Sequence, residues 1–110
     1  MKRASEADKA IHFIYEHARP FAQARAERIY LEEFRKSKKA LLMAESTAGT
    51  AVAREQYAYA HPAYQALLEG LRTAVENEET LRWQLVAAQA RVEVWRSEEA
   101  SARRTDRAVT

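Results

Sequence analysis

Apolar positions recur at alternating intervals of four and three residues along the C-terminal half of the chain. The repeat runs from Leu67 to Glu99, and eight of its ten positions are apolar. These positions are Leu67, Leu71, Ala74, Glu78, Leu81, Leu85, Ala88, Val92, Trp95 and Glu99. Such a seam is typical of a helix that packs lengthwise against another helix. We therefore predict a helix over about 62–104, followed by a frayed tail over 105–110.

The N-terminal half has weaker periodicity and predicts two helices, over about 5–18 and 20–46. Ser5 is a suitable N-cap, with Asp8 at the third helical position. Pro20 cannot donate a backbone hydrogen bond, so we expect a kink or a short break near 17–19. The expected apolar face of the second helix consists of Ala26, Tyr30, Phe34 and Leu41.

A loop and a short helix connect the two halves. The stretch "STAGT" at 46–50 predicts the loop, in which Gly49 can take a positive φ. A helix over 51–60 then ends before Pro62, with His61 expected to cap the last helix. The stretch "YAYAHPAYQ" at 57–65 is either this corner or an aromatic platform for unpaired bases. No arginine or lysine lies between Gln56 and Leu71, which favours the corner.

These elements predict an all-α fold: one domain over 1–110, built as a long antiparallel helical hairpin, coiled-coil-like, with the short helix at its turn. Only the N-terminal helices can match a C-terminal helix about 60 Å long. Apolar surface left over after this pairing favours a homodimer, with Leu67, Leu71, Leu81, Leu85, Val92 and Trp95 as the interface seam. A closed hairpin and a domain-swapped one use the same seam, and both remain open.

Composition excludes several classes of protein. The chain lacks cysteine and has only two glycines, so thiolate metal sites and phosphate-binding glycine loops are not expected. No catalytic arrangement of serine, histidine and carboxylate is visible. We expect no enzyme activity, cofactor, metal or small-molecule substrate. No signal peptide or membrane-spanning stretch is apparent, which predicts a cytoplasmic protein.

The formal net charge is only +2, but cations gather along the helix expected at 20–46. On a helical wheel they form a stripe opposite the expected apolar face. The stripe consists of Arg25, Arg28, Arg35, Lys36 and Lys39. A cationic stripe on a rigid helix can follow a row of phosphates, with an affinity that falls steeply with salt. The alternative is a solvated face whose cations pair with neighbouring glutamates.

Three stretches together resemble a family of small phage and prophage proteins. They are "YLEEFRKSKKALLM" (30–43), "YAYAHPAY" (57–64) and "LRWQLVAAQARVEVWRSEEASARRTDRA" (81–108). The resemblance implies a bacterial host cytosol and gene clusters for DNA recombination. We therefore expect a phage accessory protein of recombination or replication that binds DNA or a DNA-processing protein. The alternative is a helical adaptor or inhibitor that binds only a host or phage protein, without contacting DNA.

Overall fold

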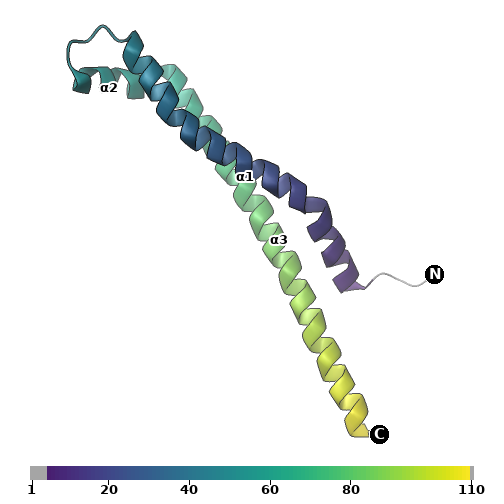
Figure 1. Ribbon diagram of the computed structural model, residues 1–110. Helices are drawn as coiled ribbons and strands as arrows, with labels where there is room; N and C mark the ends of the chain where they lie inside the picture. The colour runs from purple at the N-terminus through teal and green to yellow at the C-terminus, as the bar shows by residue number, and fades with distance from the viewer. Residues whose placement is uncertain (1–4, 110) are drawn as a thin grey trace. The chain divides into compact units, whose positions relative to one another are not determined.

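The computed structural model describes residues 5–109, which form three α-helices and no β-strand. α1 spans Glu6–Glu45, α2 spans Ala51–Ala60 and α3 spans Pro62–Val109 (Figure 1). The predicted all-α hairpin with a short helix at its turn is confirmed. The chain divides into two compact units: the first combines residues up to Phe21 with those from Thr80 onward, and the second spans Ala22–Glu79.

α1 is a single helix where the sequence predicts two. Of the kink or short break expected near 17–19, the break is absent, because the helical pattern continues through Pro20. A proline inside a helix removes one hydrogen bond, here the one to the carbonyl of Glu16. Both residues are exposed, so water can hydrogen-bond to that carbonyl in place of the missing amide.

The ends of α1 and α3 show how local hydrogen bonds set the helix boundaries. The predicted cap at Ser5 is present: its hydroxyl accepts a bond from the Asp8 amide at 3.0 Å, and the Asp8 carboxylate accepts one from the Ser5 amide at 3.3 Å. At the C-terminal end, α3 remains helical to Val109. The expectation of a frayed tail is therefore wrong for residues 105–109. Arg107 lies in the last turn, where a cation stabilises the negative end of the helix dipole. Thr110, the last residue of that tail, lies outside the described residues.

The second unit is closed by a small apolar core at the turn. Leu42 from α1, Ala58 from α2 and Tyr64 from α3 are buried together, with Met43 and Leu68 packed against them. Because α1 approaches this turn as α3 leaves it, the two helices run antiparallel within the unit (Figure 1).

Hydrogen bonds hold the loop between α1 and α2 without unusual backbone geometry. The Arg54 side chain donates to the carbonyl of Ala48 at 2.8 Å, and the hydroxyl of Thr50 accepts from the Ala53 amide at 3.1 Å. Thr50 is thus the N-cap of α2. Gly49, which is able to take a positive φ, does not do so.

In the first unit, alanines form the buried positions. Ala7 and Ala10 are buried on α1, and Ala88 is buried on α3. Small side chains allow helix backbones to approach closely, but they bury little apolar area each. This unit consequently has no large, fully enclosed side chain among its described residues.

Candidate nucleic-acid interface

The five predicted stripe residues do not share one solvent-facing surface. Arg25, Arg35 and Lys36 are exposed, whereas Arg28 and Lys39 are half-buried. The apolar face expected opposite them is also wrong in part. Tyr30 and Leu41 are well exposed, and the buried side of α1 near the turn is marked by Leu42 instead.

Arg28 is an internal ion-pairing residue. Its Nη2 donates to Glu78 Oε1 at 3.0 Å, its Nε donates to Glu78 Oε2, and its Nη1 donates to Glu32 Oε2 at 3.0 Å. Hydrogen bonding to Glu78 first and Glu32 second raises the pKa of Arg28 above its ordinary value. With both donor edges engaged, this guanidinium has little capacity left for an external phosphate.

Glu78 explains why an arginine is tolerated on this side of α1. It is the polar position inside the α3 seam and is only 7% exposed. A buried carboxylate is costly without a partner, and the bidentate arginine supplies one from the facing helix. The pair joins α1 to α3 at one register, the role in which polar seam residues are best attested.

The corner at 57–65, which we call the tyrosine corner, contains a pair of packed aromatic rings. Tyr64 is buried in the core, and the Tyr59 and Tyr64 rings pack in a T-shaped arrangement, with centroids 5.3 Å apart and an interplanar angle of 66°. The Gln65 side chain donates to the Tyr59 carbonyl at 2.7 Å. His61 caps the start of α3, as predicted, because its Nδ1 accepts from the Ala63 amide at 3.0 Å.

Lys39 of α1 reaches this corner. Its Nζ lies 4.8 Å from the centroid of the Tyr59 ring and 3.4 Å from Glu55 Oε1. Hydrogen bonding with the Tyr59 side chain raises the pKa of Lys39, and Glu55 raises it further. A cation over an aromatic face at this distance is an attractive cation–π contact.

Lys39 and the two tyrosines lie at a surface hollow of about 340 Å³, which we call the basic–aromatic hollow. It is lined by Arg35, Lys36, Lys39, Tyr59 and Tyr64. Lys36 also lies 3.4 Å from Glu33, but no ion pair within residues 5–109 involves Arg35. Arg35 is therefore the cation most available to an external anion.

Sequence reasoning missed this site because its parts come from different helices. The sequence has no arginine or lysine between Gln56 and Leu71, which counts against an aromatic platform. In the fold, α1 brings Arg35, Lys36 and Lys39 beside Tyr59. The arrangement offers cations for phosphate and an aromatic ring for a planar group.

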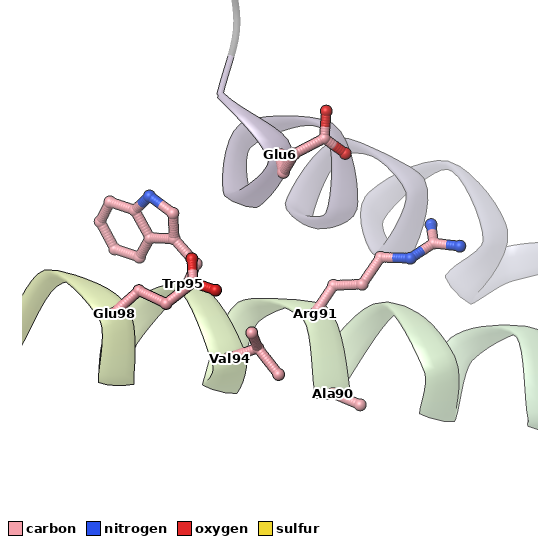
Figure 2. A pocket seen from close by; sticks show the side chains of 6 residues that line it. All are labelled: Glu6, Ala90, Arg91, Val94, Trp95 and Glu98. Carbon is pink, nitrogen blue, oxygen red and sulfur yellow. The ribbon is translucent and has the colours of Figure 1, made fainter.

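The predicted seam lies on the side of α3 that is least exposed. Leu67 and Leu71 in the second unit are half-buried. In the first unit, Leu81, Leu85 and Val92 are likewise half-buried, whereas Trp95 is exposed. Trp95 instead lines an open hollow of about 420 Å³ with Glu6, Ala90, Arg91, Val94 and Glu98, shown in Figure 2.

Other kinds of site find no support in the described part of the chain. No group of three or more potential metal ligands is present between residues 5 and 109. Nor does any helix in that range have the length and apolar character needed to cross a bilayer. No family model matches the chain, and no curated protein or solved structure shows significant similarity to it. The resemblance to phage proteins therefore stays a prediction.

Proposed function

We propose that this chain is a non-enzymatic nucleic-acid-binding protein that uses the basic–aromatic hollow. The observation that supports the proposal is that Arg35, Lys36 and Lys39 line one hollow with Tyr59 at the hairpin turn, with Lys39 in contact with the tyrosine ring. Phosphate contacts from lysine and arginine supply most of the affinity of such proteins. Arg25, exposed on the same helix, extends the contact, whereas Arg28 keeps its structural role.

The number of cations sets the expected salt dependence. Contacts from the three cations of the hollow give a slope of about −2 to −3 in a plot of log affinity against log salt, and a fourth contact from Arg25 makes it steeper. Between 50 and 200 mM salt, the affinity then falls by about 20- to 40-fold. A shallower slope would mean that fewer than three cations touch phosphate.

The test is a titration of labelled single-stranded and duplex DNA at both salt concentrations. Arg35→Ala is the informative variant, because Arg35 lines the hollow and has no ion pair within the described chain. Arg72→Ala is the matched control, an exposed arginine on α3 that does not line the hollow. We expect Arg35→Ala to weaken binding and flatten the salt slope by nearly one, and the control to change neither. Absence of binding by the wild type at 50 mM salt would refute the proposal.

A second candidate is a helical adaptor that binds only protein. It is favoured by the exposed aliphatic and aromatic side chains on α1, chiefly Tyr30 and Leu41. The Tyr30 ring stacks on Phe34 with centroids 5.8 Å apart, which makes a fixed apolar surface. If DNA does not bind, affinity capture from host and phage lysates should be compared between wild type and Tyr30→Ser/Leu41→Ser. Partners lost only in the variant would support this candidate.

The biological setting of the proposal follows from the resemblance described above. We place the protein in the bacterial cytosol during phage infection, in DNA recombination or replication. That it acts as a homodimer is proposed separately, from the apolar surface left over after the helices pair. Light scattering coupled to size-exclusion chromatography tests the dimer directly. A mass of one chain, 12.6 kDa, at micromolar concentration would refute it.

A further inference from the structure

We infer that the nucleic acid bound at the basic–aromatic hollow is single-stranded and that one unpaired base stacks on Tyr59. This inference rests on the proposed function and adds the class of nucleic acid. It follows from how the Tyr59 ring is held, from what surrounds it and from the size of the hollow.

The Tyr59 ring is both accessible and fixed. The residue is 40% exposed, yet its ring packs at 66° against the ring of buried Tyr64, Lys39 Nζ lies over one of its faces, and its backbone carbonyl accepts from the Gln65 side chain. A ring already held in place loses little conformational freedom when a ligand stacks on it. Base–aromatic stacking is sequence-tolerant, because every base has a π-face.

The cations lie where the backbone of a stacked nucleotide would need them. Lys39 Nζ lies over one face of the Tyr59 ring, 4.8 Å from its centroid, and Arg35 and Lys36 line the same hollow. Because that face is occupied, a base must stack on the opposite face or displace the lysine from the ring. A base on the ring therefore brings its own phosphate or the adjacent one toward positive charge. Stacking and charge neutralisation then act on one nucleotide, as in grooves that bind single strands.

Duplex DNA does not suit this hollow. Its bases already stack on their neighbours, and exposing one requires unpairing and unstacking it. At about 340 Å³, the hollow is at the small end of the range for ligand sites, which suits one planar group and not a double helix. Duplex can reach the same cations only through its phosphates.

The test compares two oligonucleotides with the same number of phosphates, oligo(dT) and an abasic strand of equal length, both at 50 mM salt. We expect the wild type to bind oligo(dT) about tenfold more tightly, the difference being the stacked base. Tyr59→Leu should bind both strands equally, with the affinity of the wild type for the abasic strand. Tyr59→Phe keeps the ring and should keep the preference.

Tyr57→Leu is the matched control. Tyr57 lies on the same short helix with nearly the same exposure, 41%, but does not line the hollow. Its removal should leave the tenfold preference intact. Circular dichroism of each variant verifies that the helices persist.

The outcomes separate the two proposals. Equal binding of both strands by the wild type overturns the stacking inference and leaves phosphate binding in place. A preference that survives in Tyr59→Leu also overturns it, since another residue must then stack the base. Absence of binding to either strand refutes the proposed function itself.

Discussion

Two adjacent leucines near the end of α1 provide a direct test of which side of the helix faces the core. Leu42 is 2% exposed and packs with Ala58 and Tyr64, whereas Leu41 is 57% exposed. Removing a buried leucine side chain costs its transfer free energy plus a cavity term, together about 3 kcal/mol for Leu42→Ala. Leu41→Ala removes atoms that are mostly in water and improves helix propensity slightly, so its effect should stay within about 0.5 kcal/mol.

Urea denaturation followed by far-ultraviolet circular dichroism measures this difference. For a slope of about 2 kcal/mol per molar urea, Leu42→Ala should lower the unfolding midpoint by about 1.5 M, and Leu41→Ala should barely move it. Equal losses, or a larger loss for Leu41→Ala, would refute the assignment of the buried face. The position of the basic–aromatic hollow would be refuted with it, because the same face assignment places Arg35 beside Tyr59.

Three further outcomes follow from the geometry. Gly70→Ala should raise stability by about 1 kcal/mol, since Gly70 lies inside α3 and an added Cβ meets nothing within 4 Å beyond its own stretch of helix backbone. Ala66→Gly, one turn earlier, should cost a similar amount, and a lower thermal midpoint for Gly70→Ala would show that another group packs there. Glu78→Gln should destabilise the chain and lower its urea midpoint, because Arg28 loses its main carboxylate partner. The double variant Arg28→Leu/Glu78→Leu removes both charges and should recover a urea midpoint near that of the wild type. The pKa of Lys39 is raised above its unfolded-state value of 10.5, so the contacts of the charged lysine stabilise the folded state. This stabilisation is fully present below pH 10.5 and is lost as the pH rises through the folded-state pKa. Thermal midpoints at pH 9 to 12 should therefore fall more in the wild type than in Lys39→Gln, and equal slopes would contradict this.

The α3 seam was predictable because its spacing is carried by leucines and alanines at nearly every turn. The face of α1 was not, because this helix has two competing stripes. The exposed one carries large side chains such as Tyr30 and Leu41, and the buried one is interrupted by Arg28. A charged residue in a helix is interpreted as solvent-facing unless its partner is known. The partner of Arg28 is Glu78, which lies fifty positions away in the sequence. Periodicity within one helix cannot reveal that pair.

The candidate site was likewise predictable from the sequence only in part. Arg35, Lys36 and Lys39 were identifiable as a basic cluster, and Tyr59 and Tyr64 as an aromatic one. Their convergence depends on the antiparallel return of the chain through α2, which brings distant residues together. The continuity of α1 through Pro20 was also missed, because the cost of an interior proline depends on whether water can reach the carbonyl that it leaves unpaired.

The positions of the two tryptophans have a spectroscopic consequence. The chain contains only Trp83 and Trp95, and both belong to the first unit. Emission excited at 295 nm therefore reports on that unit alone, while helical ellipticity sums over both. Coincident unfolding curves from the two signals would show one cooperative transition. An emission change that comes first would show that the alanine-lined unit opens while the tyrosine corner is still folded.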